Sequence, residues 1–339
     1  MTSTPPGLGP HVLGQRVVVR RLVPGETGPS GGPAFVDVLG VLETWADGVA
    51  TVRKEDGEVV RIKIADVVSG KPVPPRPSAR LRVTAAVAER RALASWPARE
   101  TEHLDDWVLR AADGFSSRAN SVLAVGDPGL PLGPALARVV EFYRARGLPP
   151  LAQVVVDSDE HRDLAAAGWV GARPGEDDTL FQLASVSAAR RSVRRSLPPV
   201  VPTVTVSSHV DAAWLADDER ALSHGEAAVG VLAGPVEVGL VSVRATGSDE
   251  VVAKGRVARG NGDEPGDEDW AGITNVWVSP DHRRQGLGTV VMSALLEWAA
   301  ERGATTAYLQ VRGDNPAAIA AYEKLGFTTH HAYRYLTVR

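Results

Sequence analysis

The sequence contains no cysteine, which excludes disulfides, thiolate metal ligands and a cysteine nucleophile. It also lacks any run that approaches the ~20 consecutive apolar residues of a membrane-spanning helix. Its first residues, MTSTPPGLGPHVLG, have no basic segment followed by an apolar core, which is the pattern of a secretory signal. We therefore expect a cytoplasmic protein with no membrane partner and no metal site.

An excess of one charge is missing as well. Lys and Arg number 37 and Asp and Glu number 41, so the formal net charge is -4. This balance argues against a surface built as a whole to hold nucleic acid, although a local basic patch stays possible. Hydrophobic residues make up 44% of the 339, enough for a real core. A chain of this length typically forms two or three domains of about 100 to 150 residues.

Two proline-rich breaks, Ser69–Arg80 and Arg195–Thr203, interrupt the chain where no helical or strand period continues. We therefore expect three domains, over residues 1–75, 80–190 and 203–339.

The first domain has the pattern of a small all-β barrel. Its alternating runs are separated by a Gly/Pro/Ser loop at 24–33 and by Asp-Gly pairs at 47–48 and 56–57, which are strong hairpin signals. This pattern predicts an SH3-like or Tudor-like barrel, which either binds a peptide or nucleic acid or is purely structural. Its basic residues form either a binding patch or a solvated strand face. They are Arg16, Arg20, Arg21, Arg53, Lys54, Arg61 and Lys63.

Strand and helix patterns alternate in the other two domains, which predicts an α/β (α+β) fold for both. In the second domain, the order strand, helix, strand, helix, strand ends at residues 178–185. In the third, the run 228–245 indicates the first part of a strand meander. A helix is expected between Gly288 and Gly303, and Asn315 is the predicted N-cap of a last helix.

The most informative stretch is VWVSPDHRRQGLGTVVM, Val276–Met292, in which an apolar strand runs into two arginines and a glycine pair before a helix starts. Such a turn points backbone N–H groups and the positive end of a helix dipole at one spot, so we expect an anion there. The turn lacks the G-x-G-x-x-G pattern of dinucleotide folds and the Gly-Lys-Ser/Thr ending of a phosphate loop. Taken alone, it is also compatible with a purely structural role.

The residues from Ile273 to Leu336 resemble the C-terminal half of a GNAT acyl-CoA N-acyltransferase. The parts occur in the family's order: a strand ending V-x-V-x-P, the Arg/Gln-x-x-Gly-x-Gly/Ala turn as Arg283–Gly288, and N-x-x-A-x-x-x-Y-E-K-L-G-F from Asn315 to Phe327. The resemblance implies the GNAT fold and acetyl-CoA as cosubstrate. It also implies transfer of the acetyl group to a primary amine by direct attack in a ternary complex.

The resemblance further implies which residues bind the cosubstrate. Backbone N–H groups from about Arg284 to Thr289 would hold the pyrophosphate, and the two glycines would let a phosphate approach closely. The strand before the turn would pair its main chain with the pantetheine arm, near Asn315. The expected binding residues are Val276, Trp277, Val278, Arg283, Arg284, Gln285, Gly286, Leu287, Gly288, Thr289 and Asn315.

One catalytic residue carries over, Tyr322, whose phenol would hydrogen-bond or protonate the departing thiolate. A general base is not identified, because the strand Ala271–Asn275 lacks the glutamate that many family members carry there. The open alternatives are a water relay, no dedicated base, an acid of the preceding loop (Glu268 or Asp269), and a base such as His330 or His331.

The acceptor amine stays open between a lysine of a basic protein and a small molecule. The acidic loop Asp263–Asp269 either attracts a cationic amine or is simply solvated. An alternative function is a CoA-sensing or protein- or nucleic-acid-binding module with little catalytic activity, which the missing glutamate favours.

The second domain resembles a degenerate GNAT half. Its segment DLAAAGW parallels AYEKLGF, but Ala165–Ala167 supply no tyrosine. Its glycine turn, Gly126–Gly133, contains prolines, which lack an N–H, and has no arginine before it. We expect this half to be a scaffold or to help shape the acceptor cleft. The whole order is similar to a set of actinobacterial proteins labelled histone-acetyltransferase-like, a label that implies a lysine or basic-protein acceptor.

Overall fold

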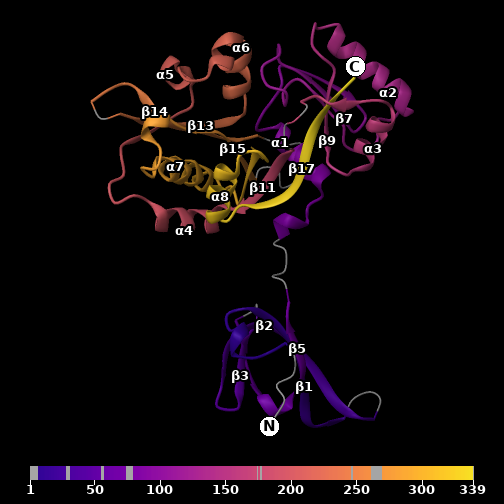
Figure 1. The fold of residues 1–339 in the computed structure, drawn as a ribbon, viewed down its shortest axis with the longest axis vertical. Helices are drawn as coiled ribbons and strands as arrows, with labels where there is room; N and C mark the ends of the chain where they lie inside the picture. The colour runs from indigo at the N-terminus through magenta and orange to yellow at the C-terminus, as the bar shows by residue number, and fades with distance from the viewer. Residues whose placement is uncertain are drawn as a thin grey trace. The chain divides into compact units, whose positions relative to one another are not determined.

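The computed structural model describes residues 7–27, 31–54, 57–73, 79–173, 175, 178–245, 247–260 and 269–338. The chain forms two compact units, residues 1–78 and 79–339, each of which is described by itself (Figure 1).

The first unit is an antiparallel sheet with the strand order β4-β3-β2-β1-β5. Alternate residues such as Val17 and Val19 are fully buried, which is the period-2 pattern of strands with one face on a core. The loop expected at 24–33 is shorter than predicted, because pairing of the first two strands extends to Thr27 and Pro33. The bounds are β1 (Arg16–Thr27), β2 (Pro33–Ala46), β3 (Val49–Arg53), β4 (Val59–Lys63) and β5 (Val67–Pro72).

The hairpin turn expected at 47–48 is confirmed, since Asp47 and Gly48 have φ of 52° and 72°. Of the second Asp-Gly turn, Asp56 lies outside the described residues. Several basic residues of this unit are ion-paired on the strand surface, which favours a solvated face over a binding patch. The pairs are Arg20–Asp37, Arg53–Glu43 and Lys54–Glu58.

The second unit is built on one long sheet. The strand order is β12-β13-β14-β15-β16-β11-β17-β9-β8-β7-β6, and β10 pairs with β17. The strands are β6 (Glu100–Leu104), β7 (Trp107–Ala111), β8 (Val122–Leu123), β9 (Leu151–Val155), β10 (Val170–Gly171), β11 (Thr179–Ser185), β12 (Val204–Ser207), β13 (Glu237–Arg244), β14 (Val251–Arg259), β15 (Trp270–Val278), β16 (Thr306–Arg312) and β17 (Thr328–Thr337).

Helices cover the faces of this sheet (Figure 1). In the described ranges, none of them is long and apolar enough to cross a bilayer. They are α1 (Ala85–Leu93), α2 (Leu132–Arg144), α3 (Asp159–Ala166), α4 (Val186–Ser196), α5 (Ala212–Leu215), α6 (Glu219–Ala233), α7 (Leu287–Glu301) and α8 (Pro316–Lys324).

The two halves of this unit exchange strands. β11 follows the first half along the chain but lies between β16 and β17 of the second half. β17 in turn runs across to pair with β9 of the first half, as its long yellow arrow in Figure 1 shows. The halves therefore share one hydrogen-bonded sheet.

Two segments differ from the sequence-based expectation. The first part of the run 228–245 is not a strand but the end of α6, where Ala228, Val231 and Leu232 are buried at helical spacing. A short apolar run fits a buried helix and a buried strand equally well, so its periodicity does not separate them. The structure also adds a helix that was not expected, α4 (VSAARRSVRRS), in which Val186, Ala189 and Val193 are buried at helical spacing among four arginines.

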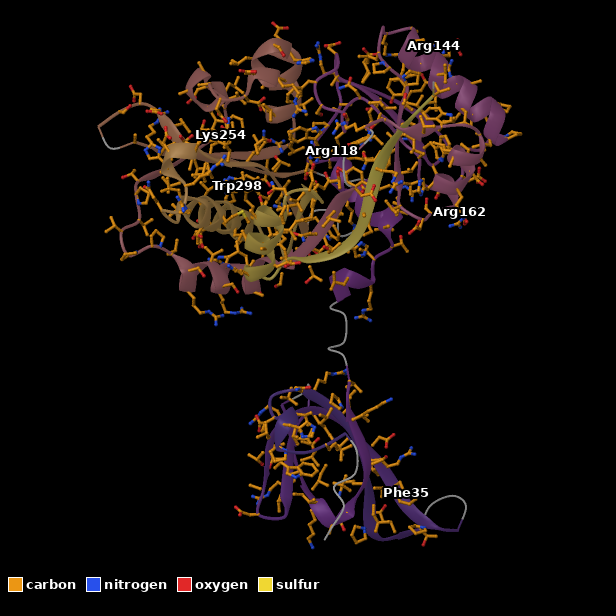
Figure 2. The ribbon with its side chains drawn as sticks, in the orientation of Figure 1. Phe35, Arg118, Arg144, Arg162, Lys254 and Trp298 are labelled. Atoms are coloured by element: carbon orange, nitrogen blue, oxygen red, sulfur yellow. The ribbon has the colours of Figure 1, made fainter. Side chains whose placement is uncertain are left out.

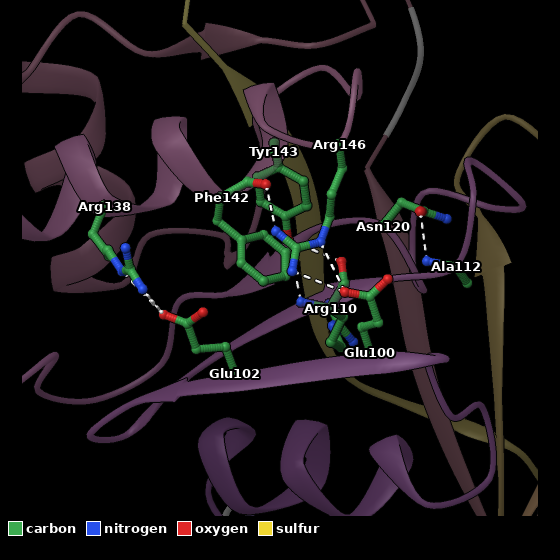
Figure 3. Close-up of polar contacts among 9 residues, drawn as sticks. All are labelled: Glu100, Glu102, Arg110, Ala112, Asn120, Arg138, Phe142, Tyr143 and Arg146. Atoms are coloured by element: carbon green, nitrogen blue, oxygen red, sulfur yellow. Dashed lines mark hydrogen bonds and ion pairs between the residues drawn. The ribbon is translucent and has the colours of Figure 1, made fainter.

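A polar cluster organises the first half. Tyr143 donates its hydroxyl to the carbonyl of Arg110 at 3.1 Å, and Arg146 lies 3.7 Å from the centre of the Phe142 ring (Figure 3). Beside this cluster, Asn120 fixes the loop 113–119. Its side chain accepts hydrogen bonds from the N–H groups of residues 112 and 114 and donates to the carbonyls of 115 and 116, at 2.8 to 3.0 Å.

Candidate active site

β15 and β16 run parallel and then separate, which opens a gap in the sheet. Their last paired residues are Ile273 and Leu309, although β15 continues to Val278. A register shift against β14 accompanies the separation, and Asn275 takes a left-handed conformation there, with φ of 53°. Asparagine tolerates this region better than most side chains. Within the described part of the chain, the sheet therefore presents an unpaired strand edge at the gap.

Alternation along β15 decides which peptide groups face the gap. Ser279 donates its N–H to the carbonyl of Val252 in β14 at 2.8 Å. Successive peptide groups of a strand point to opposite sides, so those of Val278 and Val276 turn toward the gap. By the same alternation, the main chain of Trp277 turns toward β14.

The turn after β15 presents a row of N–H groups. α7 begins at Leu287, and Gly286 precedes it in a left-handed conformation, with φ of 80°. No described residue accepts a hydrogen bond from the main-chain N–H groups of residues 284–288. Thr289 has the first N–H that is used, which donates to the carbonyl of Gly286 at 3.0 Å. Free donors at the start of a long helix are typical of an anion-binding site.

A cavity of about 750 Å³, here called the turn cavity, lies between β15, this turn, α7 and α8. It brings together the predicted cofactor-binding residues and Tyr322, with the exception of Gln285, which is exposed and does not line it. Sequence reasoning missed Ser196 at the end of α4 and Lys324 at the end of α8, which also line it. Lys324 had a signal, because it lies two residues from Tyr322 in the motif. Ser196 had none, because only tertiary packing brings α4 to α7.

Asn315, the N-cap of α8, and Tyr322 within this helix differ in the hydrogen-bonding groups that they offer to a ligand. The side-chain oxygen of Asn315 caps the helix by accepting from the N–H of Ala318 at 3.2 Å, as expected for an N-cap, and its amide N–H groups stay available for a ligand. Tyr322 packs edge-on against Phe327, with 6.0 Å between ring centres. Burial raises the pKa of the Tyr322 phenol to about 12. This phenol therefore keeps its proton at neutral pH and can donate it.

The glycines of the turn leave room beside the main chain. A Cβ at Gly288 would meet only a methyl group of Val278, at 3.8 Å, which is an ordinary contact. At Gly286 a Cβ would lie 3.3 Å from Pro198 in a backbone conformation that side chains rarely adopt. The protein therefore tolerates a side chain at Gly288 better than at Gly286. A ligand bound to the N–H groups would collide with such a side chain at Gly288.

A second cavity, of about 240 Å³ and here called the arginine cavity, lies on the opposite face of the sheet at the same gap. Along β16, Leu309 and Val311 pack with α7, whereas Gln310 and Arg312 line this cavity. Thr274 of β15 lines it too, two residues before Val276 of the turn cavity. The two cavities thus lie at the same gap, on opposite faces.

No described residue that lines either cavity is acidic or a histidine. Residues 263–268 of the acidic loop, Glu268 included, lie outside the described residues, and Asp269 is exposed and lines neither cavity. Nowhere in the described ranges do three His, Asp or Glu side chains gather as a metal site needs.

The histidines considered as a base lie in a buried network instead. His331 Nε2 lies 2.9 Å from a carboxylate oxygen of Glu89, and His330 Nε2 lies 2.8 Å from the carbonyl of Val83. The Nδ1 atoms of the two rings are 2.7 Å apart. Burial lowers the pKa of His330. Both rings have partners within the protein and line neither cavity.

The glycine turn of the first half is filled by carboxylates of the protein. Gly126 donates its N–H to Glu160 at 2.7 Å, and Asp127 donates its N–H to Asp106 at 3.0 Å. An incoming phosphate would meet negative charge here instead of free donors. The N–H groups of Gly126 and Asp127 are therefore engaged by the protein, whereas no described residue accepts from those of residues 284–288.

The chain matches two family models. Residues 84–336 match the family described as "Probable histone acetyltransferase Rv0428c C-terminal", and residues 11–71 match "Rv0428c N-terminal Sm-like domain". The small barrel expected to be SH3-like is thus of the Sm-like kind.

Curated relatives span most of the chain. The uncharacterized N-acetyltransferase YobR of Bacillus subtilis is 30% identical over 256 residues, which are 73% of this chain and 96% of its own length. The probable histone acetyltransferase Rv0428c of Mycobacterium tuberculosis is 30% identical over 325 residues, 96% of this chain and 95% of its own. The ribosomal protein bS18-alanine N-acetyltransferase of Escherichia coli is 48% identical over 59 residues, but these are only 17% of this chain and 40% of its own.

Solved structures share the fold. A tandem GNAT protein from the clavulanic acid biosynthesis pathway is 17% identical, with a TM-score of 0.53 over 76% of this chain and 93% of its own. A GCN5-related N-acetyltransferase from Kribbella flavida is 20% identical, with a TM-score of 0.51 over 76% of this chain and 96% of its own. The chain therefore belongs to the Rv0428c family of probable histone acetyltransferases and is an acyltransferase of the GNAT type, with tandem GNAT halves behind an Sm-like domain.

Proposed function

We propose that the protein transfers an acetyl group from acetyl-CoA to a primary amine by direct attack in a ternary complex. The observation that carries the proposal is the run of free N–H groups at 284–288, which opens on the same cavity as the β15 edge and Tyr322. Those N–H groups would hold the pyrophosphate, aided by the helix dipole and by the side chains of Arg283 and Arg284.

The strand edge would orient the rest of the cosubstrate. The peptide groups of Val276 and Val278 face the gap and would pair with the amides of the pantetheine arm, as one strand pairs with another. The amide of Asn315 lies on the same cavity as a further donor. The N–H of Val276 would donate to the thioester oxygen and stabilise the negative charge that develops on it.

In the transfer itself, the amine nitrogen forms a bond to the thioester carbon and the carbon–sulfur bond breaks. Tyr322 would give its proton to the departing thiolate. The proton lost by the amine would pass to water, because no described residue that lines either cavity is acidic or a histidine. Orientation of the two reactants in the gap would then supply most of the rate enhancement.

The first test is calorimetric titration of the whole protein with acetyl-CoA, followed by thiol-release assays with a panel of amines and basic peptides. Binding with turnover on any amine supports the transferase. Binding without turnover favours a CoA sensor, in line with the absence of an acidic side chain among the described residues that line the cavities. Failure to bind acetyl-CoA would refute the assignment of the turn.

A further inference from the structure

The arginine cavity is strongly cationic. No described residue of its lining is acidic. The first half supplies Arg118 and Arg173, and the second half supplies Arg220 and Arg312. Arg173 contacts Ser117 and Tyr335, and Arg312 pairs with Asp314, so these two add charge while they are already engaged.

Arg118 is the best placed of these cations. It lies on the loop 113–119 that Asn120 fixes, and its guanidinium carbon lies 5.1 Å from the centre of the Trp96 ring. Its Nε is buried and has no hydrogen-bond partner among the described residues. Figure 2 places Arg118 where the two halves of the unit meet. The cavity therefore holds a guanidinium whose position is fixed and whose hydrogen bonds are not all used.

A second buried cation adds to the field. Arg256 has no exposed surface and lies 5.0 Å from the same Trp96 ring. Its hydrogen bonds go to neutral oxygens, among them the hydroxyl of Thr274 at 3.2 Å, which lines the cavity. Burial lowers the pKa of Arg256 to about 9, which leaves it cationic at neutral pH. Among the described residues no carboxylate pairs with this charge, so its field would favour an anion in the nearby cavity.

Gln310 supplies an independent sign of a ligand. Both its side-chain oxygen and its side-chain nitrogen are buried without a hydrogen-bond partner in the described part of the chain. Buried amides are nearly always paired in folded proteins, because leaving them unpaired destabilises the fold. Gln310 lines the arginine cavity on β16, one residue beyond the last pair with β15. Its donor and acceptor are therefore unsatisfied by the described residues at the wall of this cavity.

We infer that the acceptor is a small amine that also carries an anionic oxygen group, a carboxylate or a phosphate, which Arg118 binds while Gln310 hydrogen-bonds the rest of the molecule. The inference rests on the proposed function and names the substrate class for it. A guanidinium fork matches both anions and would repel a lysine-rich tail. The cavity volume of about 240 Å³ lies below the roughly 300 Å³ at which pockets for drug-sized ligands begin, so it suits a metabolite.

The test compares ligands that differ in one group, titrated into the whole protein with and without CoA. One pair is a pool of free amino acids against the matching carboxamides, and the other is phosphoethanolamine against ethanolamine. We expect one anionic member to bind at least tenfold more tightly than its neutral partner, and the pair that shows this identifies carboxylate or phosphate. Equal binding within both pairs, or tighter binding of a lysine-rich peptide, would overturn the inference.

Two variants assign the effect to the cavity. Arg118→Gln should remove the preference for the anionic ligand while acetyl-CoA affinity stays unchanged. Gln310→Leu should weaken the same ligand but keep or raise the melting temperature, because it removes a buried unpaired amide. The matched control is Arg144→Gln, an exposed arginine on α2 at the outer side of the first half, which should change neither (Figure 2). A preference that survives both cavity variants refutes the site.

The proposed acetyl transfer and the inferred acceptor class can be refuted independently of each other. Loss of the acetyl-CoA signal with a retained anion preference would refute the transferase alone. Tight acetyl-CoA binding and turnover on neutral amines, without an anion preference, would refute only the acceptor class.

Discussion

The two glycine turns of the second unit occupy the same place in their GNAT halves and have opposite electrostatics. In the second half, no described residue accepts from the N–H groups of 284–288, which lead into a helix of fifteen residues, α7. In the first half, the N–H groups of Gly126 and Asp127 already bind carboxylates, and Pro131 at the start of α2 has no N–H to give. A fold can thus be repeated without its anion site, because the site depends on which donors the protein leaves unsatisfied.

The largest effect is expected from blocking the glycine turn after β15. Gly288 and Gly133 are both the second residue of their helices, and neither is crowded. Gly288→Leu places a side chain over the free N–H groups, and we expect acetyl-CoA affinity to fall at least about 100-fold, which is about 2.7 kcal/mol. Calorimetric titration measures this.

Gly133→Leu is the matched control for that variant. A Cβ at Gly133 meets nothing within 4 Å, so this change should leave both the fold and acetyl-CoA affinity intact. Equal affinities of the two variants would show that the turn after β15 does not bind the cosubstrate.

Tyr322 is the next point of contrast, since the parallel segment DLAAAGW of the first half contains no tyrosine. We expect Tyr322→Phe to lower kcat by about 100-fold, the lower end of the range for a general acid, with little change in acetyl-CoA affinity. Thermal stability should be unchanged, because the phenol has no hydrogen-bond partner among the described residues. An unchanged kcat in steady-state assays would remove Tyr322 from the mechanism.

The role of the carboxylates at the glycine turn of the first half can be tested by neutralising one of them. Glu160→Gln weakens a charge-assisted bond to the N–H of Gly126, and its loss should cost about 1 to 3 kcal/mol of the free energy of unfolding. Denaturant titration measures this cost. Acetyl-CoA affinity should not change, because the proposed site lies at the turn after β15. A gain of a second acetyl-CoA site in the variant would contradict the view that the prolines also disable this turn.

The smallest expected effect is on the alkaline side of the pH profile. A general acid must keep its proton, and the pKa of Tyr322 is raised to about 12, so its deprotonation should not lower the rate until the pH approaches that value. The plot of kcat/KM against pH should instead rise as the acceptor amine loses its proton, because only the neutral amine is a nucleophile. A falling limb near pH 9 or 10 that disappears in Tyr322→Phe would contradict the raised pKa.

The local parts of the candidate site could be predicted from the sequence because their geometry is set by neighbours along the chain. The left-handed glycine at 286, the helix after it and the Asn315 cap all depend on contacts within a few residues. Asn275 is an exception within this stretch. Its sequence neighbours predicted a plain strand, and only the pairing with β14 shows that it sits at a register shift.

The sequence by itself therefore determined the GNAT-like half, the turn with its free donors, and the failure of the first half to supply a tyrosine. Tertiary structure alone decided the exchange of β11 and β17, the packing of α4, the filling of the first turn by Glu160 and Asp106, and the arginine cavity. These features join residues that lie far apart along the chain. Such pairings leave no periodic trace in the sequence, because any register or partner of similar chemistry would produce the same local pattern.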